Sequence, residues 1–145
     1  MRTSPLPMAM LLALSACLPV PRTTRASPRV LGSYRHADGT PVAGASIAVS
    51  TGDKGPVCGG TLTKTVTDST GHFEIPETQV HHSFTMVVGE FMALYSICAL
   101  SGAQWQQLYR EQSRRDPPKE VILECVAPLD ASEGTCEVRG MTPAQ

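Results

Sequence analysis

The sequence predicts an all-β protein with one short helix, and two stretches of the chain carry that prediction. Residues 37–49 are Ala-Asp-Gly-Thr-Pro-Val-Ala-Gly-Ala-Ser-Ile-Ala-Val, and residues 65–76 are Thr-Val-Thr-Asp-Ser-Thr-Gly-His-Phe-Glu-Ile-Pro. Each stretch combines Asp, Gly and Pro, which favour tight turns, with alternating apolar and polar residues. Such alternation is typical of half-buried strands, so each stretch is expected to contain strands and short turns.

The remaining strands are predicted from the same alternation. The threonines at 61, 63, 65 and 67 suit a pleated surface, because β-branched side chains are stiff there. Residues 91–100 are nearly continuously apolar, which favours a buried strand. Further strands are expected over residues 30–36, 83–88, 119–126 and 135–139. The apolar positions of these strands define the predicted core: Ile47, Val49, Val66, Phe73, Ile75, Phe84, Met86, Ile97, Val121 and Leu123.

One segment departs from strand alternation. Trp105, Leu108 and Tyr109 lie at positions i, i+3 and i+4 within residues 102–115, with Gln and charged residues between them. This spacing is typical of an amphipathic helix, and the two prolines at 117 and 118 would end it. We expect the aromatic pair to pack onto the sheet; a contact to a partner or a sugar is the alternative.

The first residues are typical of an export signal. Arg2 precedes a short apolar run over residues 8–14, which is too short to span a bilayer. The run ends in Leu-Ser-Ala-Cys, which resembles a bacterial lipobox, so residues 1–17 are expected to be a lipoprotein signal with Cys17 as the lipidation site. The alternative is an ordinary cleaved signal without lipid. The residue after the cysteine is Leu18 rather than Asp, and by analogy with bacterial lipoproteins this favours the outer membrane.

The next segment is rich in proline. Residues 18–29 contain Pro19, Pro21 and Pro28 and have no periodicity, so we expect a tether. Such a segment extends about 3.1 Å per residue and would hold a domain roughly 30 Å from a membrane. A disordered start without a spacing role is the alternative. The domain itself is expected over residues 30–140, and residues 141–145 are expected to be a disordered tail.

The cysteine count predicts disulfides. Apart from Cys17 there are four cysteines, at 58, 98, 125 and 136, and an even number in an exported chain implies two bridges. Cys125 and Cys136 lie on strands of a predicted hairpin with the same parity, which favours Cys125–Cys136 and leaves Cys58–Cys98. The two other pairings remain open. A zinc site is disfavoured, because there is no CxxC pair and no histidine at ligand spacing from a cysteine.

No catalytic, metal or nucleic-acid motif stands out. The 145 residues carry a formal net charge of −1 without a basic stripe, which disfavours nucleic acid as a partner. His81 and His82 are adjacent and would face opposite sides of a strand. There is no Gly-x-Ser-x-Gly elbow, P-loop or Gly-x-Gly-x-x-Gly motif. We therefore expect neither catalytic residues nor a metal or other cofactor.

The phrases at 38–49 and 65–76 resemble those of the carboxypeptidase-regulatory-like domain. The resemblance covers residues 30–76 and implies an antiparallel, transthyretin-like β-sandwich. That family serves mostly as a structural or binding module beside other domains. One transthyretin-like enzyme, the hydroxyisourate hydrolase, depends on a C-terminal Tyr-Arg-Gly-Ser signature. This chain instead ends Arg-Gly-Met-Thr-Pro-Ala-Gln, so the resemblance does not extend to that chemistry.

The function expected from these features is a non-catalytic binding or structural module of a bacterial cell-envelope lipoprotein. Its partners would be the membrane, through the lipid anchor, and an envelope protein or glycan. Two alternatives remain: an enzyme or enzyme accessory acting on carbohydrate or peptide in the periplasm, and an accessory lipoprotein of a secretion apparatus. A cleft with convergent polar groups around His72, His81 or His82 would favour the enzyme.

Overall fold

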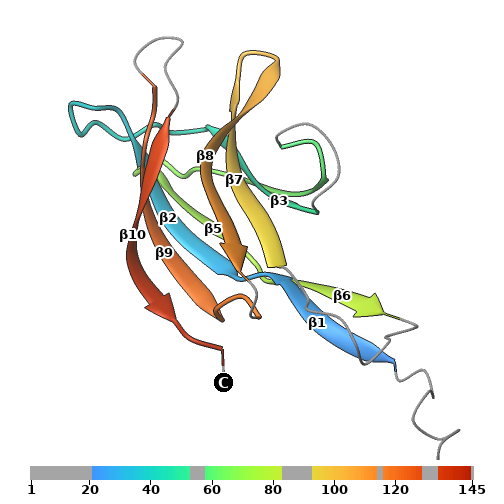
Figure 1. Cartoon of the computed structure of the whole chain (residues 1–145). Helices are drawn as coiled ribbons and strands as arrows, with labels where there is room; N and C mark the ends of the chain where they lie inside the picture. The colour runs from blue at the N-terminus through green and yellow to red at the C-terminus, as the bar shows by residue number, and fades with distance from the viewer. Residues whose placement is uncertain (1–20, 53–57, 83–92, 114–115, 129–133, 145) are drawn as a thin grey trace, which may run out of the picture.

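The computed structural model describes residues 21–52, 58–82, 93–113, 116–128 and 134–144. These residues form an all-β protein whose ten described strands are drawn in Figure 1. The strands are β1 (Arg22–Ser27), β2 (Arg29–Arg35), β3 (Ser46–Thr51), β4 (Thr61–Val66), β5 (His72–Ile75), β6 (Thr78–His82), β7 (Ala93–Ser101), β8 (Gln104–Ser113), β9 (Glu120–Val126) and β10 (Thr135–Thr142).

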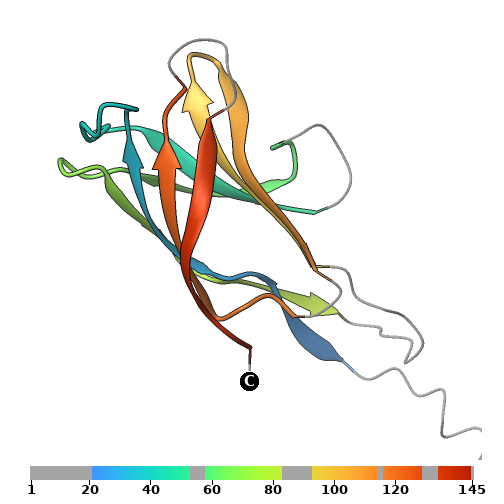
Figure 2. The ribbon, with the colours of Figure 1, turned by 60° about the vertical axis from the view of Figure 1, so that its left-hand side comes forward.

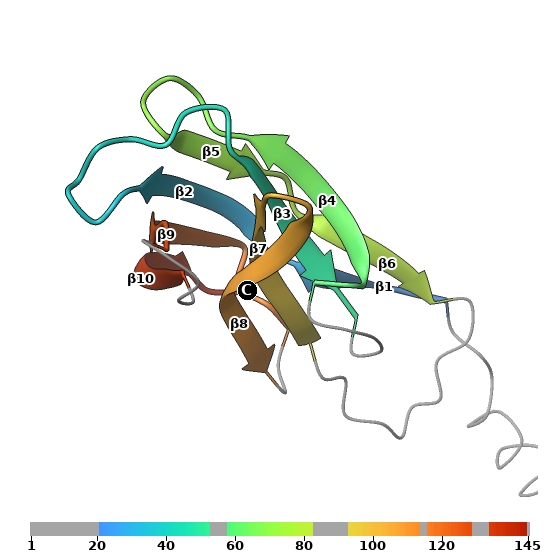
Figure 3. The same cartoon turned by 90° about the horizontal axis from the view of Figure 1, so that it is seen from above.

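Eight of these strands form a β-sandwich. One sheet has the order β10-β9-β2-β5 and the other has the order β4-β3-β7-β8, and they lie as two layers (Figure 3). Neighbouring strands are antiparallel except β2 and β9, which pair in parallel from Arg29 opposite Glu120 to Arg35 opposite Val126. The prediction of a wholly antiparallel sandwich is therefore wrong at this pair. The parallel pairing joins a strand near the start of the domain to one near its end.

The core lies between the two sheets. Seven predicted core residues are buried: Ile47, Val49, Phe73, Ile75, Ile97, Val121 and Leu123. Val66 is 59% exposed, so its prediction as a core residue is wrong. It lies opposite Ser46 on the side of β4 that faces away from the core, because strand parity directs every second residue outward. Phe84 and Met86 lie outside the described residues.

The segment predicted as a helix is strand β8. It pairs with β7, and the register places Ile97 opposite Tyr109 but Cys98 opposite Gln107. Leu108 is therefore the extra residue of a β-bulge, and its side chain is buried. A bulge shifts the alternation of faces by one residue. This explains why apolar residues in a strand have the three- and four-residue spacing of a helix.

The predicted tether contains a strand. Residues 22–27 form β1, which pairs with β6 as a two-stranded ribbon. The ribbon extends away from the sandwich, at the end opposite the β7–β8 turn (Figures 1 and 2). Its base is packed into the molecule, since Ser27 and Pro28 are fully buried and β1 contacts β3 and β7. At the other terminus β10 continues to Thr142, into the predicted tail.

The predicted turns use the expected chemistry. Asp38 Oδ1 accepts hydrogen bonds from the backbone N of Thr40 (2.9 Å) and from its hydroxyl (2.6 Å). Gly39 adopts φ 87°, a left-handed conformation that suits glycine. The second turn, between β4 and β5, is built in the same way around Asp68 and Gly71 and borders the candidate site.

Candidate functional site

The candidate site is a groove on the outer face of the β10-β9-β2-β5 sheet. Its volume is about 580 Å³, and Leu31 of β2 and Ile122 of β9 are opposite each other on its floor. Ile122 is 43% exposed, which is high for a large apolar side chain on a sheet. The other lining residues come from β2, β5, β9, β10 and the end of β4 with the turn that follows: Gly32, Ser33, Thr65, Val66, Asp68, His72, Phe73, Glu74, Leu123, Glu124 and Arg139.

Strand register explains why these side chains meet. His72 of β5 lies opposite Ser33 of β2, and Ser33 lies opposite Glu124 of β9. The neighbouring row runs from Glu74 through Leu31 to Ile122. Residues opposite one another in a sheet share a face, so polar and apolar rows lie side by side across the groove.

The β4–β5 turn orients His72 at one end of the groove. Asp68 Oδ1 accepts hydrogen bonds from the backbone N of Thr70 (2.8 Å), the Thr70 hydroxyl (2.7 Å) and the backbone N of His72 (3.0 Å). The hydrogen bonds from Thr70 lower the pKa of Asp68. The Thr70 hydroxyl also lies 2.7 Å from His72 Nδ1.

These contacts assign the tautomer of His72. A carboxylate only accepts hydrogen bonds, so the single hydroxyl hydrogen of Thr70 goes to Asp68. Thr70 must then accept from His72, which places a hydrogen on Nδ1. In the neutral ring Nε2 is therefore the acceptor. The turn presents one defined hydrogen-bonding group of His72 at the groove.

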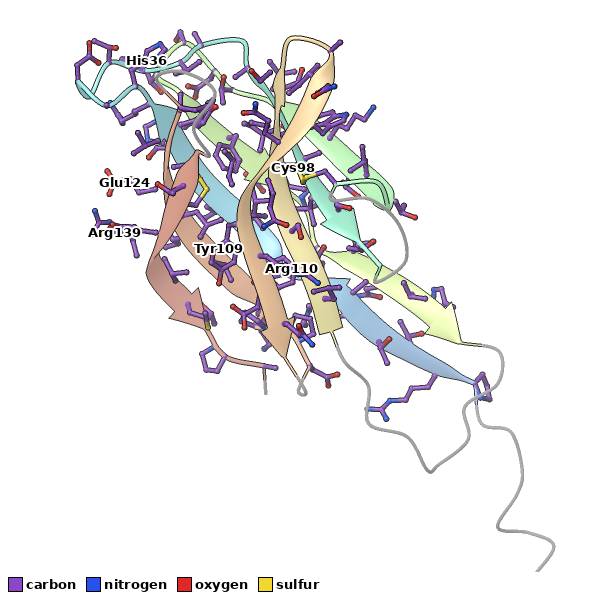
Figure 4. The ribbon with its side chains drawn as sticks, turned by 45° about the horizontal axis from the view of Figure 1, so that its top comes forward. His36, Cys98, Tyr109, Arg110, Glu124 and Arg139 are labelled. Atoms are coloured by element: carbon purple, nitrogen blue, oxygen red, sulfur yellow. A yellow bond between two sulfur atoms is a disulfide. The ribbon has the colours of Figure 1, made fainter. Side chains whose placement is uncertain are left out.

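Two arginines border the groove, and each bridges two carboxylates. Arg29 lies 2.8 Å from Glu74 and 3.0 Å from Glu120, and the hydrogen bond to Glu74 raises the pKa of Arg29. Arg139 lies 2.6 Å from Glu124 and 3.4 Å from Glu137. Figure 4 shows Glu124 and Arg139 close together at the outer side of β9 and β10. The hydrogen bond that Arg139 donates to Glu124 raises the pKa of Arg139.

The charges on this face do not balance. The two arginines meet four carboxylates and Asp68 adds a fifth, so these seven side chains carry two positive and five negative charges, a formal net charge of −3. All of these side chains are partly or largely exposed, so each ion pair contributes little to stability. Their main effect is on what the groove attracts.

The four domain cysteines form two disulfides. They are Cys58–Cys98, with Cα atoms 6.2 Å apart, and Cys125–Cys136, with Cα atoms 4.0 Å apart. This is the pairing that the parity argument favours, and Cys125 and Cys136 are directly opposite each other in β9 and β10. Neither bridge lines the groove. The predicted lipidation site, Cys17, lies outside the described residues.

His36, His72 and His81 lie in different parts of the structure, and the side chain of His82 lies outside what is described. His36 lies in the Asp38 turn and accepts, through its carbonyl, a hydrogen bond from Gly39 N, while His81 lies in β6 with Nδ1 2.7 Å from the Thr23 hydroxyl. Only His72 of these lines the groove. Among the described residues no three His, Cys, Asp or Glu side chains are arranged to hold a metal ion.

A tyrosine pair lies inside the sandwich. The rings of Tyr95 and Tyr109 are 6.3 Å apart, and Tyr109 Oη donates a hydrogen bond to Glu111 at 2.6 Å. Burial raises the pKa of both hydroxyls. Tyr95 Oη is buried without a hydrogen-bond partner in the described part of the chain. Because the pair faces the core, it is packing rather than part of the groove.

Sequence reasoning did not identify the groove. His72, Glu74, Glu124 and Arg139 belong to strands that are distant in the sequence, and the β2–β9 pairing that joins them is parallel. Their outward parity was a visible signal, but parity alone does not say which strands are neighbours.

In the part of the chain that is described, no helix is long and apolar enough to cross a membrane. No protein-family model matches the chain, and no curated protein matches it significantly.

Proposed function

We propose that this chain is a non-catalytic binding module of a bacterial cell-envelope lipoprotein, and that the groove contacts a segment of an envelope protein. The observation that carries the proposal is the concave outer face itself. Its floor exposes Leu31 and Ile122, and its rim is charged. An apolar floor within a polar rim is the usual anatomy of a contact surface.

The charge of the face selects the chemistry of the partner. A formal net charge of −3 favours a segment that carries lysine or arginine, because complementary charge speeds encounter and discriminates against acidic partners. An apolar side chain of that segment would cover Ile122. Its basic side chains would reach Glu74 and Glu124, and a donor would meet His72 Nε2.

A glycan is the second candidate, and one observation favours it. On the other sheet Lys64 Nζ lies 5.5 Å from the ring of the half-buried Trp105. An indole offers a flat apolar face and a polar N–H, and a sugar ring could pack on such a surface. The groove has no comparable ring, since Phe73 is buried beneath it. A glycan would therefore bind on the opposite face of the molecule.

The alternative of an enzyme is favoured by the row that contains Ser33 and His72. The two residues are opposite each other in β2 and β5, and Thr70 and Asp68 orient the imidazole. A hydrolase would use Ser33 as nucleophile and His72 as base. Ser33→Ala would then abolish hydrolysis of a model ester, whereas the binding proposal predicts no hydrolysis by either form.

Affinity capture with two matched variants tests the groove. Ile122→Arg adds a positive charge on the groove floor, and Leu100→Arg makes the same change at a residue of similar exposure, 39%, on the other sheet. Each variant is used as bait to capture proteins from detergent-solubilised envelope. The Ile122→Arg variant should lose the partner, and the Leu100→Arg variant should retain it. Equal capture by both variants would show that the groove is not the contact surface.

The lipid anchor is a separate part of the proposal and has its own test. It is supported by Leu-Ser-Ala-Cys at the end of the apolar run and by two disulfides, which suit an oxidising compartment. Cys17→Ser should move the protein from the membrane fraction to the soluble fraction. An intact mass that corresponds to an unmodified chain would refute lipidation.

A further inference from the structure

The β1–β6 ribbon is the part of the described structure that is nearest in sequence to the proposed lipid anchor. β1 begins at Arg22, five residue steps after Cys17. A chain extends at most about 3.6 Å per residue, so these steps span no more than about 18 Å. If Cys17 carries the lipid, the tip of the ribbon must lie within that distance of the membrane surface.

The ribbon is rigidly joined to the sandwich. At its base Arg25 lies 3.0 Å from Glu77 Oε2 and donates a hydrogen bond to the carbonyl of Pro117 at 3.1 Å. Glu77 also accepts a hydrogen bond from Gln79 at 2.8 Å. The hydrogen bond from Arg25 to the chain between β8 and β9, together with the buried Ser27 and Pro28, resists hinging. The orientation of the ribbon therefore sets the orientation of the whole domain.

The composition of the ribbon suits an anionic surface. β1 contains two arginines and neither strand contains an acidic residue, but Arg25 is paired with Glu77 directly before β6, so the positive charge at the tip is that of Arg22. Arg22 is exposed and lies opposite His82 at the tip. Val80, which lies opposite Thr24 two residues further along β1, is 40% exposed. By contrast the groove face has an excess of carboxylates, which an anionic membrane would repel. Charge thus distinguishes the end that approaches the membrane from the face that does not.

We infer that the β1–β6 ribbon docks on anionic phospholipid headgroups and holds the sandwich upright beside the membrane. This inference rests on the lipid anchor of the proposed function. It replaces most of the predicted tether with a spacer that begins at Arg22. The five steps of β1 add about 17 Å between its tip and the sandwich. The β7–β8 turn and the turn around His36 then face away from the membrane, and the groove faces sideways.

Hydrogen exchange on membranes tests the docking. The acylated protein is reconstituted on vesicles of phosphatidylcholine alone and on vesicles of phosphatidylcholine with phosphatidylglycerol. Exchange is measured by mass spectrometry for residues 22–27 and 78–82, with residues 120–126 as an internal reference. We expect the ribbon to exchange about fivefold more slowly on the anionic vesicles, the factor that one arginine near such a surface supplies. The protection should disappear at high salt.

Two charge reversals complete the experiment. Arg22→Glu at the tip should remove the protection, and Arg35→Glu, at the far end of β2, should preserve it. Equal ribbon exchange on both kinds of vesicle, with the protein still sedimenting with them, would overturn the docking and leave the anchor intact. If the chain expressed from its full sequence carries no lipid and sediments with neither kind of vesicle, the anchor is refuted, and the docking with it.

Discussion

At Gly32 the core leaves no room for a side chain, and substitution of this residue tests the packing of the sandwich. A Cβ at this position would lie 2.6 Å from Cε1 and 2.9 Å from Cε2 of Phe73, and closer still to Cζ. Real Cβ atoms do not approach other atoms so closely, so the ring would have to move. Phe73 is 5% exposed and belongs to the core between the sheets, which resists that movement.

The expected cost of Gly32→Ala is about 1–3 kcal/mol of the free energy of unfolding, the range for overpacking a dense core. Gly140→Ala is the control, because its Cβ would approach Cδ1 of the exposed Ile122 at 3.3 Å and would lie at an ordinary 3.8 Å from Cβ and Cγ1 of the same residue. Urea denaturation followed by circular dichroism gives both values, with disulfides intact. We expect the control to change stability by less than about 0.5 kcal/mol.

A double-mutant cycle separates the clash from any other effect of the methyl group. Phe73→Ala alone should cost about 3–5 kcal/mol, because it removes a buried ring and leaves a cavity. With the ring absent, the alanine at position 32 partly fills that cavity. The double variant should therefore cost at least about 1 kcal/mol less than the sum of the single variants. Additive costs, or a harmless Gly32→Ala, would refute the packing derived from β2 and β5.

Two further predictions concern covalent and electrostatic stability. Removing either Cys125–Cys136 or Cys58–Cys98 should lower the free energy of unfolding by about 2–4 kcal/mol. The loss should be larger for Cys58–Cys98, because this bridge closes the longer loop. Denaturation of paired Cys→Ala variants measures both losses, and equal or zero losses would contradict the prediction. The lowered pKa of Asp68 stabilises the fold above the pKa of the unfolded chain, about 3.9, and that contribution is lost as the pH falls through the lower, folded pKa. Asp68→Ala should therefore flatten the acid limb of a stability–pH curve, and an unchanged limb would count against the turn geometry.

Much of the fold was predictable because local chemistry and tertiary structure agree in most strands. The turn at Asp38 and the strand over residues 72–75 follow directly from turn residues and from apolar alternation. Strand β8 was mistaken for a helix, since the bulge at Leu108 mimics helical spacing. Strand β1 was mistaken for a tether, because a ribbon exposed at its tip needs no apolar face.

The candidate site was less predictable for a different reason. Its residues face outward, where the hydrophobic pattern places few constraints on their identity. The groove forms only when β9 pairs with β2 in parallel, across most of the domain. The turn that orients His72 was predicted as a turn, but the tautomer it imposes depends on distances that a sequence does not contain.

Site-specific crosslinking tests the central claim, that the groove on the β10-β9-β2-β5 sheet contacts an envelope protein. A photoreactive amino acid replaces Ile122 in the acylated protein, and in a control it replaces Leu100, which is similarly exposed on the other sheet. After irradiation of intact cells, position 122 should yield an adduct with one envelope protein, joined through a segment rich in lysine or arginine. No adduct at position 122, or the same adduct at position 100, would contradict the claim.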